Sequence, residues 1–129
     1  MSTREAISTD AAPAAAGPYS QAIRAGDLVF TAGQLGMDAA SGELAPDIAG
    51  QAERALRNLE AILAASGSGL DRLVKVTVYL ADIGHWPAVN EVYGTIVPEP
   101  YPARSAFAVK DLPKGALVEI EAVATVGLG

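Results

Sequence analysis

Residues 117–126 read LVEIEAVATV, and this alternating stretch decides the fold. Every second residue from Val118 to Val126 is apolar and shares one face of an extended chain, because side chains alternate along a strand. The opposite face carries Glu119, Glu121, Val123 and Thr125. The stretch predicts a long strand with one buried face and a second face that is neither wholly polar nor wholly apolar.

Further segments have the composition of strands. Residues 73–81, LVKVTVYLA, predict a second long strand, with Val74, Val76, Val78 and Leu80 on one face and Lys75, Thr77 and Tyr79 on the other. Apolar runs around residues 20–24 and 28–32 flank the turn residues 25–27, which predicts a hairpin. A strand is also expected at 104–109, followed by a turn at 112–115, and a short strand near Ile7. Residues 33–42 are expected to form a loop with three glycines.

Two segments have helical periodicity. Residues 47–65 place apolar side chains at three- and four-residue steps, between Pro46 before the segment and Gly67 after it. A second helix is expected at 86–96, with Pro87 in its first turn. Its apolar side consists of Val89, Val92, Tyr93 and Ile96.

The element order predicts one α+β domain over residues 1–129, because no linker or internal repeat divides the chain. Two helices can cover only one face of such a sheet. The uncovered face carries both carboxylates and apolar side chains, and a face of this kind usually meets another subunit. The residues themselves therefore predict a homo-oligomer.

The composition excludes several kinds of chemistry. The chain has 129 residues and no cysteine, which excludes disulfides, thiolate catalysis and thiolate metal sites. The single histidine, His85, excludes a cluster of imidazole ligands. Acidic residues outnumber basic ones by 15 to 9, and the net charge of −6 argues against nucleic acid as the main partner, because phosphate contacts need Lys and Arg.

The chain also has no obvious membrane or export segment. No apolar run approaches the ~20 residues of a membrane helix. The first ten residues include Arg4, Glu5 and Asp10 and lack the apolar stretch of a signal peptide. We therefore expect a cytoplasmic protein with no membrane partner.

Two groups of residues could carry chemistry. Glu119 and Glu121 point to the same face of a strand, with Cα atoms about 6.5–7 Å apart. Like charges this close raise the pKa of one of the two carboxyls unless a cation intervenes. Such a pair could position or activate water, or it could simply line a solvated face. Arg104 lies in an apolar stretch, where its guanidinium could bind a substrate carboxylate or pair with Glu119 or Glu121 from a neighbouring strand.

Three more residues have two interpretations each. Tyr19 follows a proline turn and could be a catalytic residue that lines a pocket with its phenol as a donor, or it could be a core aromatic with a wetted hydroxyl. Asn90 could be a polar pocket residue or a solvated helix residue. His85 precedes Trp86 and Pro87 and has the place of a helix-start residue rather than a catalytic one.

Several motifs together resemble one known family. The most specific is YPARS at residues 101–105, followed by LPK at 112–114 and VEIEA at 118–122. The likeness also includes AP at 12–13, GPYSQAI at 17–23, FTAGQ at 30–34 and VN at 89–90, and so covers nearly the whole chain. These segments resemble the reactive intermediate deaminase family (Rid, YjgF-like), whose older members were called translation inhibitors or L-PSP endoribonucleases.

The resemblance implies a chorismate-mutase-like mixed sheet with two helices on one face. It also implies a homotrimer with three sheets around a barrel-like core and with active sites between subunits. The implied activity is hydrolysis of 2-imino acids, such as 2-iminobutanoate and 2-iminopropanoate, to 2-keto acids and ammonia. This reaction protects pyridoxal-phosphate enzymes, and it is expected to need no metal or other cofactor.

The resemblance also implies roles for individual residues. Arg104 matches the arginine that binds the substrate carboxylate, and Glu119 matches the acid that positions water. Tyr19 matches a tyrosine lining the pocket, Asn90 a nearby polar residue, and Gly33 a loop residue whose backbone approaches the ligand.

Two positions depart from a common family pattern. Ala32 stands where many members have serine, and Ala106 stands where several have cysteine. If these positions act through their backbone the site is preserved, whereas a role for the serine hydroxyl would alter activity or substrate preference. The competing functions are a small-carboxylate-binding or chaperone-like protein, a ribonuclease, and a pathway-specific deaminase acting on an enamine such as 2-aminomuconate.

Overall fold

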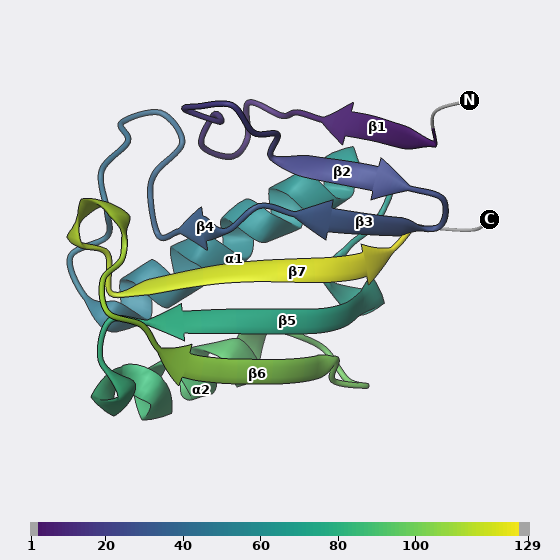
Figure 1. Cartoon of the computed structure of the whole chain (residues 1–129). Helices are drawn as coiled ribbons and strands as arrows, with labels where there is room; N and C mark the ends of the chain where they lie inside the picture. Colours follow the sequence, from purple (N-terminus) through teal and green to yellow (C-terminus); the bar gives the residue numbers. More distant parts are fainter. Residues whose placement is uncertain (1–2, 127–129) are drawn as a thin grey trace.

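A computed structural model of the chain describes residues 3–126, which form one mixed sheet with two helices packed on one face (Figure 1). The spatial order of the strands is β1-β2-β3-β7-β5-β6, and the short β4 pairs with β7. The β5–β6 pair is parallel and all other pairs are antiparallel. The strands are β1 (Arg4–Ile7), β2 (Ala22–Ala25), β3 (Leu28–Thr31), β4 (Gln34–Leu35), β5 (Leu73–Leu80), β6 (Ala103–Ala108) and β7 (Val118–Thr125).

The helices are α1 (Ile48–Ala65) and α2 (Trp86–Ile96), and both lie behind the sheet in Figure 1. Asp47 caps α1 by accepting a hydrogen bond from the Gly50 N–H at 2.7 Å, and Gly67 takes a φ of 81° after the helix ends. Short 3₁₀ helices lie at Leu70–Arg72, Ile83–His85 and Pro113–Gly115. The predicted α+β class, with two helices on one face, is confirmed.

β7 lies inside the sheet and alternates as its sequence predicts. The side chains of Val118, Ile120 and Ala122 are buried under the helices, whereas Glu119 and Glu121 are half-buried on the opposite face. The helices complete the core with buried residues that recur at helical spacing, among them Leu56, Leu59, Val89 and Tyr93.

The prediction that Val74 shares the buried face of β5 is wrong. A β-bulge interrupts the pairing of β5 with β7 between Leu73 and Lys75, and Val74 is 44% exposed. A bulge adds one residue to a strand and so shifts the alternation by one step. Leu73 packs against the core instead, while Val76, Val78 and Leu80 are buried as expected.

The prediction of an unstructured loop over 33–42 is also incomplete. Within it β4 pairs with β7, and Met37 forms an isolated bridge with Leu44. The buried Asn58 of α1 donates hydrogen bonds to the carbonyls of Leu35 and Met37 at 3.2 and 2.9 Å. A two-residue strand is too short to show a periodic pattern, so the sequence offered no sign of it.

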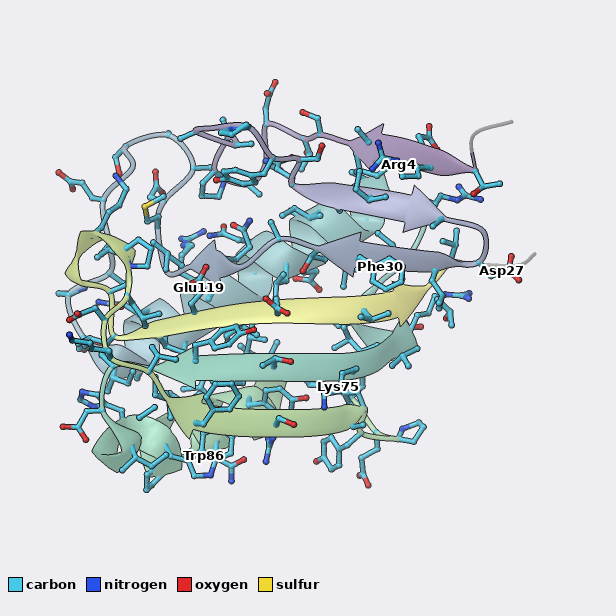
Figure 2. The ribbon with its side chains drawn as sticks, in the orientation of Figure 1. Arg4, Asp27, Phe30, Lys75, Trp86 and Glu119 are labelled. Atoms are coloured by element: carbon cyan, nitrogen blue, oxygen red, sulfur yellow. The ribbon has the colours of Figure 1, made fainter. Side chains whose placement is uncertain are left out.

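The face of the sheet without helices, here called the open face, mixes aromatic and charged side chains. Figure 2 shows Phe30, Lys75 and Glu119 on the strands that form it. Phe30 and Phe107 are each 45% exposed, and Phe107 packs edge-on against Tyr79 with ring centroids 5.4 Å apart. The open face therefore has the mixed character that its sequence predicts. Within residues 3–126 no helix is long and apolar enough to cross a membrane.

Candidate active site

Arg104 lies on the edge strand β6 and points to the side of the sheet that carries the helices. Its Cα partner in β5 is the buried Val76, which sets that direction. The guanidinium carbon lies 4.5 Å from the ring centroid of Trp86 and 4.6 Å from that of Tyr93. Both aromatic residues come from α2, seven residues apart and so on one side of the helix.

The guanidinium has no acidic partner in the part of the chain that the structure describes. The one salt bridge found between residues 3 and 126 joins Arg57 to Glu60 on α1. The interpretation of Arg104 as an ion-pair partner of Glu119 or Glu121 is therefore wrong. β5 separates β6 from β7, and the side chains lie on opposite faces of the sheet.

A cavity of about 350 Å³ opens beside Arg104. Its lining residues come from α2 and from the segment that leads into β6, namely Asn90, Tyr93, Gly94, Tyr101, Pro102 and Arg104. The structure thus places Asn90 next to Arg104, as a pocket residue. The hydroxyl of Tyr93 is buried, and it has no hydrogen-bond partner among the described residues. Burial raises the pKa of that hydroxyl, and the nearby positive charge of Arg104 opposes the shift.

Glu119 lies on the open face against Gly33, in the short connection between β3 and β4. A Cβ atom on Gly33 would overlap a carboxylate oxygen of Glu119, so only glycine allows this approach. Burial raises the pKa of Glu119, and the neighbouring charge of Glu121 raises it further. A raised pKa was predicted for one of the two glutamates; it is found at Glu119, and burial is its larger cause.

The remaining predicted site residues lie at different places. Tyr19 is exposed in the loop between β1 and β2, where its hydroxyl accepts a hydrogen bond from the Ala16 N–H at 3.3 Å. Ala32 is half-buried just after β3, and its N–H donates to the Gln21 carbonyl at 2.9 Å. Ala106 lies on the helix side of β6, where it packs against the core.

The candidate residues of one chain thus form two separate groups. The arginine group consists of Arg104, Asn90, Tyr93 and Trp86, on the helix side of the sheet edge. The glutamate group consists of Glu119, Glu121 and Gly33, on the open face. Figure 2 shows the separation, with Glu119 on β7 and Trp86 at the start of α2 behind β6.

Sequence reasoning missed five residues as parts of the site, namely Trp86, Tyr93, Gly94, Tyr101 and Pro102. A signal for Trp86 was present, because Trp86 and Tyr93 are seven residues apart on a predicted helix and therefore share one side of it. His85 precedes α2 and makes no side-chain capping hydrogen bond. Among residues 3–126 no group of three or more His, Asp or Glu side chains is placed to hold a metal ion.

The fold and the site together define a class of α+β protein. Its members combine a mixed sheet that has two helices on one face with an arginine between aromatic rings at the sheet edge and a glutamate packed against a glycine. Residues 9–126 match the family model described as Endoribonuclease L-PSP. The chain belongs to this family, which includes the Rid and RutC proteins.

Relatives match over almost the whole chain. A RutC family protein of Sinorhizobium fredii is 53% identical over 92% of this chain and 95% of its own. The 2-iminobutanoate/2-iminopropanoate deaminase of Bos taurus is 50% identical over 96% of this chain and 91% of its own. The crystal structure of RidA from an Antarctic Psychrobacter species has a TM-score of 0.92 at 44% identity, covering 95% of this chain and 99% of that one.

Proposed function

We infer that this protein hydrolyses reactive 2-imino acids, such as 2-iminobutanoate and 2-iminopropanoate, to 2-keto acids and ammonia. The observation that carries this inference is the 50% identity, over 96% of the chain, to a relative named for that activity. Removal of such imines would protect the pyridoxal-phosphate enzymes that release them.

The hydrolysis of an imine depends more on orienting the substrate and the attacking water than on activating either of them. Water adds to C2 of the C=N group, and both protons of that water pass to the nitrogen in turn. Ammonia then leaves as the C2–N bond breaks and the C2=O bond forms. An unpaired guanidinium in a cavity suits a planar carboxylate, because it can donate two parallel hydrogen bonds. We assign carboxylate binding to Arg104, which fixes the position of C2.

We assign to Glu119 the role of positioning the attacking water and accepting its proton. Burial raises its pKa and so makes the carboxylate a better proton acceptor for the attacking water. Gly33 allows the carboxylate to approach the β3–β4 connection. We assign Tyr19, Asn90, Ala32 and Ala106 to substrate contacts around these groups, the two alanines acting through their backbone.

Because Arg104 and Glu119 lie on opposite faces of one sheet, we propose that each active site combines the arginine group of one chain with the glutamate group of another. A homotrimer whose sheets meet through their open faces would provide three such sites. The half-exposed Phe30 and Phe107 support burial of this face by another copy.

Subunit mixing tests both the residues and the shared site. Arg104→Ala and Glu119→Gln trimers should each lose about 10-fold to 150-fold in kcat/KM, since a charge-assisted hydrogen bond is worth about 1.5–3 kcal/mol. Random trimers refolded from equal amounts of the two variants should regain roughly one quarter of wild-type activity, because each site draws its two groups from different chains. No regain would show that the two groups do not act across an interface.

The family description also names an endoribonuclease, and the net charge of −6 opposes that function because RNA phosphates need basic contacts. RNA cleavage that depends on Arg104 would favour it, whereas binding of small carboxylates without turnover would favour a non-catalytic protein. Turnover of an enamine such as 2-aminomuconate in preference to 2-iminobutanoate would indicate a pathway-specific deaminase. The single domain, the cytoplasmic location and the absence of a cofactor and of a nucleic-acid partner stay predictions.

A further inference from the structure

We propose that Trp86 and Tyr93 are positioning residues that hold the Arg104 guanidinium in its carboxylate-binding orientation. The inference rests on the proposed function and adds two residues to it. Neither aromatic residue is expected to touch the reacting atoms.

Arg104 needs such support because of its place in the fold. β6 is an edge strand, so no further strand restrains the side chain on its outer side. Nor does any acidic side chain among residues 3–126 pair with the guanidinium. A long side chain without a partner samples many rotamers, and binding a carboxylate would then cost the entropy of fixing it.

The two rings provide the missing restraint. Each ring centroid lies within 4.6 Å of the guanidinium carbon, well inside the distance of about 6 Å over which a cation is attracted to a ring face. A ring face attracts the cation without occupying its N–H donors, so the donors stay available to a carboxylate in the cavity. An ion pair with a protein carboxylate would have used the same donors.

The helix fixes the rings in turn. Trp86 is the first residue of α2 and Tyr93 lies two turns later, so one rigid element carries both. Tyr93 is 2% exposed, and Trp86 packs against the same core from its edge. Tyr93 also lines the cavity beside Arg104, and burial raises the pKa of its hydroxyl while the charge of Arg104 lowers it, so the residue belongs to the site as well as to the core.

Kinetics of matched variants test the proposal. Trp86→Leu should raise KM for 2-iminobutanoate and weaken binding of the carboxylate probe 2-oxobutanoate by a similar factor, about twofold to thirtyfold, the range that one cation–π contact covers. Trp86→Phe, which keeps a ring, should restore most of the loss. The control is Val92→Ala, which loosens α2 against the core at a residue that is not among those lining the cavity. A loss of equal size in Val92→Ala, or no restoration by Trp86→Phe, would overturn the proposal.

A second measurement does not depend on activity. Trp86 is the single tryptophan of the chain, so the intrinsic tryptophan emission reports directly on its contact with Arg104. Arg104→Ala should change this emission, whereas Arg57→Ala, at the remote ion pair on α1, should not. Unchanged emission in Arg104→Ala would refute the contact. A changed emission in a protein that does not hydrolyse imines would instead refute the proposed function and leave the contact established.

Discussion

At the scale of single residues, Gly33 is where the backbone and the candidate catalytic carboxylate meet. In Gly33→Ala the new Cβ would overlap the Glu119 carboxylate, which must then move. We expect little loss of stability, because the carboxylate ends a flexible, half-buried side chain that can move away, and a fall in kcat of tenfold or more, because the carboxylate is displaced. The control is Gly17→Ala, whose Cβ would meet the Tyr19 ring at an ordinary 3.7 Å. Chemical denaturation and steady-state kinetics measure the two effects, and full activity in Gly33→Ala would contradict the placement of Glu119.

The raised pKa of Glu119, again a property of a single residue, predicts how the rate depends on pH. Its ionised form is the one that accepts a proton from water, so kcat/KM should rise with pH through a pKa above the usual glutamate range. In Glu121→Gln this rise in kcat/KM should move to lower pH, because the charge of Glu121, one of the two causes of the raised Glu119 pKa, is removed. Burial, the larger cause, should keep it above the usual range. If the rise in kcat/KM occurs at the same pH in Glu121→Gln as in wild type, the two carboxylates do not interact.

The raised pKa of the Glu119 carboxyl also predicts how the free energy of unfolding depends on pH. The folded-state pKa of Glu119 is raised above that of the unfolded chain, so its contribution to stability is fully present below the unfolded pKa. That contribution is lost as the pH rises through the folded pKa. Glu119→Gln should therefore unfold at a higher denaturant concentration than wild type only above this range. An equal difference at all pH values would argue against the raised pKa.

At the scale of elements, the side-chain amide of Asn58 joins α1 to the segment that carries Gly33 and β4. Asn58→Ala leaves the partly buried carbonyls of Leu35 and Met37 without their donor, which should cost about 1 kcal/mol or more of unfolding free energy. Activity should fall as well, because the segment holds Glu119 in place. Asp47→Ala removes only the helix cap, at about 1 kcal/mol, and serves as the comparison. If both variants lose stability and Asn58→Ala keeps full activity, the segment does not support the site.

The helices and strands also show which structural features can be predicted from sequence patterns. Both helices were predicted to within a residue of their observed ends, because caps, prolines and a period near 3.6 are local signals. β5 was predicted as a strand, but its bulge was not, because a bulge depends on pairing with β7 and not on the alternation within β5 itself. The same reason explains why β4 was missed.

At the scale of the whole molecule, the open face predicts assembly. Phe107→Lys places a charge on the open face and should convert trimers to smaller species, which light scattering detects as a lower mass. Ile83→Lys alters a side chain of similar exposure, 57% against 45%, that lies outside the sheet, and it should leave the mass unchanged. A trimeric Phe107→Lys protein would show that another surface makes the contact.

The sequence by itself determined the fold class, the buried and exposed faces of β7, and the identity of Arg104 and Glu119 as candidate residues, because periodicity and residue chemistry are local properties. Only the tertiary structure decided which of these residues meet. The register of the parallel β5–β6 pair turns Arg104 toward α2, while the antiparallel β5–β7 pair turns Glu119 toward the open face. A shift of one residue in either register would reverse these directions, and register is set by contacts between strands far apart in the chain.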